Sequence, residues 1–216
     1  MRILLLIIVF LFIVLIVNAQ DTTAIKRMVC RFKVTRTSGS PEYGTGFILG
    51  HQNDTLYLAT AGHVLRYRAK NAPIIVTIGD SADTLHACIK LYRDTDNGDS
   101  EDLAICSVVA KGYEYPKFIA LDTLRTNMPV FYYHNEHLYA ESGEGDQLLI
   151  TRNKKAHTYK VYMPDVQGGD SGGPVFTSGA SPYLTGIVIS GDRSCEVLCI
   201  SQILDIVKKE LPPLNP

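Results

Sequence analysis

Between Met28 and Ser201 the chain consists of short runs rich in β-branched and aromatic residues, separated by stretches of turn-forming residues. Many short strands at regular spacing are typical of a β-sandwich or of β-barrels, and they argue against an α/β sheet. About six runs precede Ala120 and six follow Asn127, which indicates two similar halves joined by residues 120–128. The predicted strands are Met28–Thr35, Gly46–Gly50, Thr55–Thr60, Pro73–Ile78, Thr84–Leu91, Asp102–Val109, Pro129–Tyr133, Asp146–Thr151, His157–Met163, Pro174–Thr177, Tyr183–Ser190 and Val197–Ser201.

The end of the chain differs from the rest, because apolar residues recur there at helical spacing. The apolar face consists of Ile203, Leu204, Ile206, Val207 and Leu211, and the charged residues between them lie on the other face. The two prolines that follow cannot continue a helix. We therefore predict a short amphipathic helix over residues 202–211 that packs on the β body.

The beginning of the chain carries the features of an export signal. Arg2 is followed by an unbroken apolar run over residues 3–17. This run is short for a membrane-spanning helix, which needs about 20 residues, and it ends abruptly at Asn18 and Gln20. We predict a signal peptide over residues 1–19 and a secreted or periplasmic protein. The alternative is an uncleaved N-terminal membrane anchor.

The charge balance excludes some classes of partner. The chain has 21 Lys and Arg residues against 22 Asp and Glu residues, for a formal net charge of −1. Removing residues 1–19, in which Arg2 is the only charge, makes this about −2. No block of basic residues is present, so the sequence predicts neither nucleic-acid binding nor attraction to an anionic membrane surface.

The five cysteines are interpreted as structural. An exported protein can oxidise its thiols, but an odd number leaves at least one unpaired, and none has the Cys-x-x-Cys spacing of a zinc or redox site. A hairpin symmetric about Asn97 would set Cys88 opposite Cys106 on one face of the sheet. This predicts a disulfide between those two residues. The five are Cys30, Cys88, Cys106, Cys195 and Cys199.

The strongest local motif is Gly-Gly-Asp-Ser-Gly-Gly-Pro-Val over residues 168–175. These residues also suit a plain turn, since glycine, aspartate, serine and proline all favour turns. In the functional interpretation, the glycines let the backbone N–H groups of Gly169 and Ser171 point to one spot beside the Ser171 hydroxyl. Such a pair binds the negative oxygen of a tetrahedral intermediate. We therefore identify Ser171 as a candidate nucleophile.

The same residues also fit Gly-x-Ser-x-Gly, the nucleophile elbow of α/β-hydrolases. That fold needs a helix directly after the serine and a histidine downstream of it. Gly172, Gly173 and Pro174 disfavour such a helix, and all six histidines precede Ser171. The α/β-hydrolase alternative is therefore excluded.

A general base must then lie upstream of Ser171, and His63 fits best. It follows an apolar strand, in Thr-Ala-Gly-His over residues 60–63, where small neighbours leave room for a substrate. His51 lies among turn residues and is expected to be solvated. His134 and His137 lack a third ligand at convincing spacing, so we predict no metal site.

The base also needs a buried carboxylate to orient it, and Asp102 offers one at the head of the apolar strand Asp102–Val109. Glu101 is the nearest competitor for this role. Pleat alternation places Glu101 and Asp102 on opposite faces, so only one of them can meet His63.

These motifs occur in the order Thr-Ala-Gly-His, Asp-Leu-Ala-Ile and Gly-Asp-Ser-Gly-Gly-Pro-Val, and together they resemble the trypsin-like serine peptidases. The resemblance extends to the segments 44–49 and 184–188 and covers nearly the whole mature chain. It implies a chymotrypsin-like, all-β fold of two antiparallel β-barrels with a short C-terminal helix, in one domain over residues 20–216. It further implies a first barrel over about residues 28–120, a second over about 128–201, and an active site of His63, Asp102 and Ser171 between them.

The chain departs from the animal digestive members of that family. Nothing near His63 can form the disulfide that flanks their histidine, and the first strand lacks their Ile-Val-Gly-Gly-like start. The sequence looks more like the compact bacterial branch. In the animal enzymes, the aspartate before the serine pairs with the N-terminus that cleavage frees. Asp170 occupies that position here and must have another partner.

Substrate preference is the finer question. Asp165 lies six residues before Ser171, where trypsin-like enzymes place the carboxylate that binds Lys or Arg, and Gly186 and Gly191 are candidates for the pocket walls. We predict cleavage after Lys or Arg. The alternatives are that Asp165 is a turn residue, or that Arg193 enters the pocket and favours an acidic side chain.

The predicted function is therefore that of a serine endopeptidase acting by acyl transfer on protein or peptide substrates. No cofactor and no metal ion is predicted, nor any stable membrane association once the signal peptide is removed. The alternative is a catalytically silent binding protein on a protease fold. Such proteins usually lack a triad residue, whereas all three candidates are present here.

Overall fold

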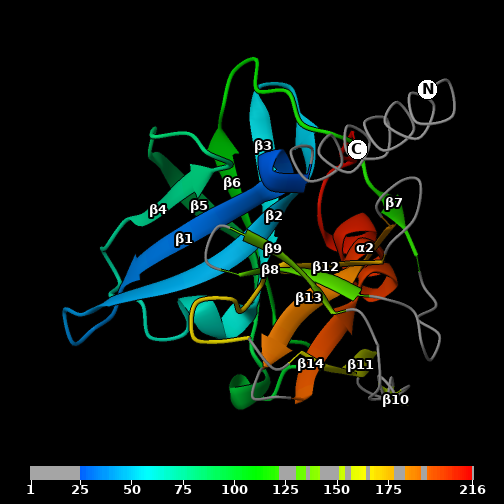
Figure 1. Cartoon of the computed structure of the whole chain (residues 1–216). Coiled ribbons are helices and arrows are strands. Elements are labelled where there is room, and N and C mark those ends of the chain that lie inside the picture. The colour runs from blue at the N-terminus through cyan, green and yellow to red at the C-terminus, as the bar shows by residue number, and fades with distance from the viewer. Residues whose placement is uncertain are drawn as a thin grey trace, which may run out of the picture.

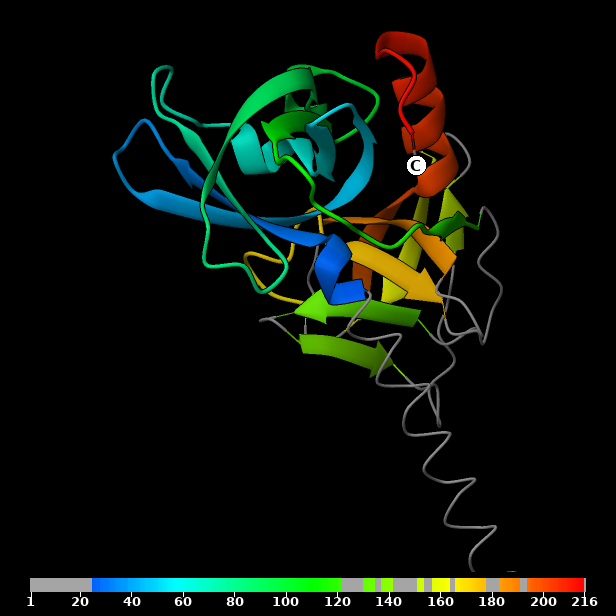
Figure 2. The same ribbon diagram turned by 90° about the horizontal axis from the view of Figure 1, so that it is seen from above.

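The computed structural model describes residues 25–121, 130–134, 137–141, 151–153, 157–163, 166–177, 183–190 and 194–215. These residues form two β structures that lie side by side, with one helix, α2, against both (Figures 1 and 2). Among the described residues, no helix is both long enough and apolar enough to cross a membrane. The predicted signal peptide, residues 1–19, lies outside the described part of the chain.

The first half is a closed barrel of six antiparallel strands. Around the barrel the strands follow the order β1-β2-β3-β6-β5-β4. Two short 3₁₀ turns, η1 (Gly62–Leu65) and η2 (Thr95–Asn97), follow β3 and β5. The strands are β1 (Val29–Thr35), β2 (Pro41–Gln52), β3 (Thr55–Thr60), β4 (Ile74–Ile78), β5 (Leu85–Arg93) and β6 (Leu103–Val109).

Side-chain alternation explains why these segments close into a barrel. In β1, Cys30, Phe32 and Val34 are buried while Arg31 and Lys33 are exposed, as the two-residue period of a strand requires. Register shifts occur between β2 and β3 and between β5 and β6. Such irregularities bend a strand and increase its twist, and this lets a sheet curve into a barrel.

The second half is a sheet in the order β10-β11-β14-β13-β12-β8-β9, and β7 adds to β13 in parallel. It curves into a half-barrel next to the first barrel (Figure 1). The prediction of a chymotrypsin-like, all-β double barrel with a short C-terminal helix is confirmed. The strands are β7 (Ile119–Ala120), β8 (Val130–His134), β9 (His137–Glu141), β10 (Thr151–Asn153), β11 (Thr158–Tyr162), β12 (Pro174–Thr177), β13 (Tyr183–Ser190) and β14 (Ser194–Cys199).

Two hydrophobic clusters fill the molecule, and β13 separates them. Leu184 and Ile187 of β13 belong to the cluster that fills the first barrel and continues under α2. Val188 belongs to the second cluster, which fills the half-barrel around Tyr132, Tyr159 and Val197. β12 and β14 likewise contribute to both clusters, so the two halves are joined through these three strands.

Helix α2 (Ile200–Glu210) begins two residues before the predicted start. The predicted strand Val197–Ser201 was wrong at its end, because β14 stops at Cys199 and the next residues turn directly into the helix. Ile200, Ile203, Ile206 and Val207 are buried, so the amphipathic pattern was interpreted correctly.

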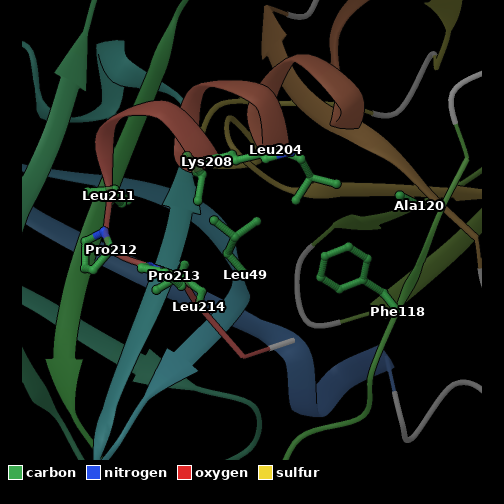
Figure 3. Close-up of a pocket in the computed structure, with 10 residues that line it drawn as sticks. Leu49, Phe118, Ala120, Leu204, Lys208, Leu211, Pro212, Pro213 and Leu214 are labelled. Carbon is green, nitrogen blue, oxygen red and sulfur yellow. The ribbon is translucent and has the colours of Figure 1, made fainter.

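The tail after α2 returns to the first barrel. The backbones of Asn215 and His51 exchange two hydrogen bonds of 2.8 Å. Helix α2, the tail, β2 and the segment that leads into β7 border an open apolar pocket of about 590 Å³, in which Lys208 is the one charged lining residue (Figure 3). Leu49 and Phe118 are among its lining residues, and none of these residues belongs to the predicted active site.

The predicted Cys88–Cys106 disulfide is wrong. Cys88 pairs with Ser107 and Cys106 with Ile89, so the hairpin is displaced by one residue from symmetry about Asn97. A displacement of one residue reverses the face of every side chain. Cys88 is accordingly exposed and Cys106 buried, and both are free thiols.

Candidate active site

His63 lies in η1, directly after the end of β3. Its ring Nδ1 lies 2.6 Å from Asp102 Oδ2, and its backbone N–H donates to Asp102 Oδ1 at 2.7 Å. One carboxylate therefore fixes both the position of the His63 backbone and the orientation of its ring. The His63 side chain keeps 25% of its surface exposed, whereas that of Asp102 keeps 7%.

Gly62 explains how the His63 backbone comes so close to Asp102. A Cβ at residue 62 would lie 1.9 Å from the Arg93 carbonyl oxygen and 2.9 Å from Asp102 Oδ1. Only glycine fits there. The Gly-His pair of the sequence motif is therefore a packing requirement as well as a sign of chemistry.

Asp102 and Glu101 point to different partners. Both are buried, with 5% and 4% of their surfaces exposed. Asp102 binds His63, while Glu101 accepts hydrogen bonds from Arg93, Ser100 and Gln202. The structure thus brings Asp102, and not its neighbour, to the histidine.

A second buried carboxylate, Asp94, supports the turn that carries His63. Arg66 donates from Nε and Nη2 to the two Asp94 oxygens, both at 2.6 Å, and its backbone N–H donates to the His63 carbonyl at 3.1 Å. Tyr92 adds a hydrogen bond from its hydroxyl to Asp94 at 3.0 Å. This bidentate ion pair ties η1 to the end of β5.

The charges of this network follow from its contacts. Burial would raise the pKa of Asp94, but hydrogen bonds from Arg66, the Asp96 N–H and Tyr92 hold it below its ordinary value of 3.8. Burial, together with the negative Asp94, raises the pKa of Tyr92 to about 12. Asp94 is therefore an anion and Tyr92 a neutral donor at neutral pH.

The loop that carries Ser171 joins the two halves of the molecule. Thr45 of β2 donates its N–H to the Ser171 carbonyl at 2.9 Å and its hydroxyl to the Gly169 carbonyl at 2.7 Å. On the other side, the Gly172 N–H donates to the Val188 carbonyl of β13 at 2.6 Å. The loop is thereby bound to the first barrel and to the second sheet.

Gly172 permits the closest approach in this region. Its φ is +85°, and a Cβ there would lie 2.2 Å from both the Thr45 carbonyl and the Thr60 hydroxyl, and 2.7 Å from the Ala61 nitrogen. Ala61 is two residues before His63. The contact therefore packs the Ser171 loop against the segment that leads into the histidine.

The predicted oxyanion donors lie in this loop. Gly169 has a φ of +104°, with open space where a Cβ would be. Within the described residues, neither its N–H nor that of Ser171 donates a hydrogen bond, whereas the N–H groups of Asp170, Gly172 and Gly173 all do. Gly169 and Ser171 therefore keep backbone donors available for a ligand.

Asp170, whose partner the sequence left open, is buried and turns back on its own loop. Its Oδ2 accepts the Gln167 N–H at 2.7 Å. This bond stabilises the turn before Ser171 from within.

Ser171 and His63 are not hydrogen-bonded to each other in the described structure. A cleft of about 340 Å³ opens beside the loop, lined by Arg31, Phe32, Tyr43, Gly44, Thr45, Gly168, Gly169 and Asp170. The cleft lies between β1 and β2 of the first barrel and the predicted oxyanion loop. It leaves space for a ligand where the two halves meet.

Of the three predicted specificity residues, the structure describes one, Gly186. Asp165 and Gly191 lie outside the described residues. Gly186 lies inside β13, where a Cβ would be 2.0 Å from the Leu198 carbonyl of β14. Close backbone packing thus accounts for Gly186. In the described part of the chain, no group of three or more acidic, histidine or cysteine side chains gathers as a metal site would need.

Sequence reasoning missed three residues of this region: Thr45, Arg66 and Asp94. A threonine between two glycines, as in Gly44-Thr45-Gly46, was the one local signal for Thr45. The acidic run of Asp94, Asp96 and Asp99 indicates a solvated hairpin tip, and this interpretation is wrong for Asp94, which is fully buried. Its partner Arg66 lies 28 residues away, so no local signal could pair the two charges.

No protein-family model matches the sequence, and no curated protein matches it. Solved structures do resemble the fold. The active form of the Rv3671c protease from M. tuberculosis has a TM-score of 0.63 and 19% identity, over 93% of this chain and 86% of that one. Deg5 has a TM-score of 0.65 and 17% identity, over 91% of this chain and 96% of that one.

The serine endoprotease from Yersinia pestis has a TM-score of 0.63 and 16% identity. The match covers 88% of this chain but only 65% of the Yersinia chain, slightly less than two thirds of it. At such identities the likeness establishes a shared fold. What the chain does with that fold must be argued from its own residues.

Proposed function

We propose that this chain is a serine endopeptidase that hydrolyses peptide bonds by acyl transfer. The observation that carries the proposal is the pair of hydrogen bonds that the Asp102 carboxylate accepts from the Nδ1 and the backbone N–H of His63. This arrangement fixes the tautomer in which Nε2 can accept a proton. The Ser171 loop packs against the segment that leads into this histidine.

In the proposed reaction, Ser171 Oγ attacks the peptide carbonyl while its proton passes to His63 Nε2. The carbonyl oxygen becomes an anion, which the N–H groups of Gly169 and Ser171 bind. The C–N bond then breaks, and His63 gives the proton to the leaving amine. Water attacks the acyl-enzyme by the same steps and regenerates Ser171.

The absence of a His63–Ser171 hydrogen bond agrees with this proposal. Catalytic hydrogen bonds are often long or poorly aligned without substrate and tighten only when it binds. Each oxyanion donor is expected to stabilise the transition state by about 2.7–4 kcal/mol. Within the described residues, the N–H groups of Gly169 and Ser171 make no hydrogen bond, so both can serve as these donors.

A fluorophosphonate probe tests the proposal directly, because it reacts only with an activated serine. Wild-type protein should be labelled at Ser171, and Ser171→Ala should abolish labelling. Ser38→Ala, on an exposed loop of the first barrel, is the matched control and should label normally. A folded wild-type protein that resists the probe would instead favour the catalytically silent binding protein.

The finer proposal is cleavage after Lys or Arg, with Asp165 as the carboxylate that pairs with the substrate cation. It rests on the position of Asp165 in the sequence, six residues before Ser171. A buried carboxylate facing an apolar side chain would lack a partner, which disfavours such substrates. Asp165→Ser should reduce cleavage after Arg and leave fluorophosphonate labelling intact. A peptide library without a preference for basic residues would refute this preference alone.

A further inference from the structure

Glu101 is a buried carboxylate directly next to Asp102, and it is held by three donors. Its Oε2 accepts from Arg93 Nη1 and from the Ser100 hydroxyl, both at 2.5 Å. Its Oε1 accepts from Gln202 Nε2 at 2.6 Å. The three donors come from β5, from the loop before β6 and from α2, so three elements converge on this one side chain.

Helix α2 contacts this site at both of its ends. Gln202 lies in its first turn and binds Glu101, while Glu210, its last residue, forms an ion pair with Arg93. Arg93 in turn binds Glu101. At 1.5 Å per residue, the two contacts lie roughly 12 Å apart along the helix. The helix is therefore fixed in direction as well as in position relative to β6.

This anchor is one residue away from the catalytic pair. Glu101 and Asp102 are consecutive residues directly before β6, and their side chains meet different partners: Glu101 binds Arg93 and Gln202, while Asp102 binds His63. One peptide unit separates the residue held by α2 from the residue that binds His63. Asp102 must place two oxygens within 2.7 Å of two His63 nitrogens, which leaves little tolerance.

We propose that Glu101 is a positioning residue for the reaction, through which Gln202 and Arg93 let helix α2 set where Asp102 meets His63. The inference rests on the proposed function and extends the catalytic apparatus to the last helix of the chain. Catalysis is sensitive to such placement, because a misplacement of about 1 Å can reduce a rate roughly 100-fold.

The charge of Glu101 indicates that its role is to position Asp102 more than to stabilise the fold. Burial would raise the pKa of Glu101, but the hydrogen bonds from Ser100, Arg93 and Gln202 lower it, so the carboxylate is charged at neutral pH. Buried charges of this kind add little to stability compared with apolar residues of similar size. They do, however, demand one geometry, since each donor must stay in place.

The test replaces Gln202, because Gln202→Ala leaves Glu101 paired with Arg93 and Ser100 and should fold. Asp205→Ala, an exposed position on the same helix, is the matched control. Gln202→Lys supplies a donor of similar reach and should restore the anchor. Turnover of a peptide ester and the low-field resonance of the proton between His63 Nδ1 and Asp102 are measured in the full chain, well below each melting temperature.

We expect Gln202→Ala to lower kcat about tenfold with an unchanged KM, and to shift or broaden the His63 resonance. Asp205→Ala should change neither, and Gln202→Lys should return both toward wild type. A Gln202→Ala protein with a lower melting temperature but wild-type kcat and resonance would show that Glu101 is only structural. An equal loss in Asp205→Ala would also overturn the proposal.

The resonance separates this inference from the proposed function, since it needs no turnover. If it responds to Gln202→Ala while no variant, wild type included, shows activity that depends on Ser171, then the endopeptidase proposal fails. The placement of Asp102 by α2 would still stand in that case.

Discussion

The two sides of the candidate active site are held by different kinds of interaction. The His63–Asp102 side rests on buried charges, namely the Arg66–Asp94 pair and the Glu101 anchor. The Ser171 side rests on backbone hydrogen bonds from Thr45 and to Val188, and on the contact made by Gly172. Changes of pH or of side-chain charge should therefore destabilise the first side. Substitutions that enlarge a side chain should destabilise the second.

The difference suits the two chemical tasks. A general base needs a fixed carboxylate beside it, and charged hydrogen bonds are the strongest way to fix one. An oxyanion site needs hydrogen-bond donors with no other partner, and a tightly turned, glycine-rich loop can present two backbone N–H groups in this way. The following predictions test whether the two sides act together and whether each fails in its own way.

The largest expected effect concerns whether the two sides form one unit. Ser171→Ala and His63→Ala should each reduce kcat by about 10⁴–10⁶-fold, and the double variant should be hardly worse than either. The reason is that neither residue can act without the other. Single-turnover assays on a peptide ester measure all three variants. Losses that add would place one of the two residues outside the reaction.

The next largest effect tests the volume sensitivity of the Ser171 side. Gly172→Ala combines a positive φ with a Cβ 2.2 Å from two oxygen atoms. It should lower the free energy of unfolding by roughly 2–6 kcal/mol, with loss of activity. Gly168→Ala, where nothing lies within 4 Å of the added carbon, is the control and should change little. Denaturant unfolding measures both, and similar values would refute the proposed contact.

A smaller effect tests the charged side. Asp94→Asn breaks the bidentate pair with Arg66 and should lower the free energy of unfolding by roughly 3 kcal/mol. Asp96 also pairs with Arg66 but is 61% exposed, so Asp96→Asn should have an effect of less than about 1 kcal/mol. Equal effects of the two substitutions would mean that burial does not distinguish the pairs.

The same pair predicts a dependence on acidity. Because the pKa of Asp94 is lowered below 3.8 in the folded protein, its contribution is present above that value and is lost as the pH falls through the folded pKa. The stability difference between wild type and Asp94→Asn should therefore be constant above about pH 5 and shrink steadily as the pH falls below that value. Unfolding curves at several pH values measure it, and a difference that does not change with pH would contradict the assignment.

The smallest effect concerns Thr45, which links the two sides. Thr45→Val keeps the shape but removes the hydroxyl that donates to the Gly169 carbonyl, and it should lower the free energy of unfolding by about 1 kcal/mol. Thr77→Val in β4, two strands away around the barrel, removes a hydroxyl that is not part of this contact and serves as the control. If Thr45→Val does not change the free energy of unfolding, the hydroxyl does not contribute to the contact between the two sides. The hydrogen bond from the Thr45 N–H to the Ser171 carbonyl would then be the contact that Thr45 provides.

The sequence alone determined the fold class and most of the strands. Three of the twelve predicted strands, Thr55–Thr60, Pro174–Thr177 and Tyr183–Ser190, match the structure residue for residue. Their patterns of β-branched and apolar residues are local properties, so they can be recognised in one segment at a time. The motifs around His63, Asp102 and Ser171 are local in the same sense, because each has its own glycine or strand signature.

The tertiary structure decided what depends on residues far apart in the chain. The register of β5 against β6 separated Cys88 from Cys106, and a one-residue displacement leaves no trace in either strand's own pattern. The contacts of Arg66 with Asp94, of Thr45 with Ser171, and of Gln202 with Glu101 join residues 28 to 126 positions apart. Such pairings depend on how the barrel closes and where α2 lies, because burial and distance exist only once the chain has folded.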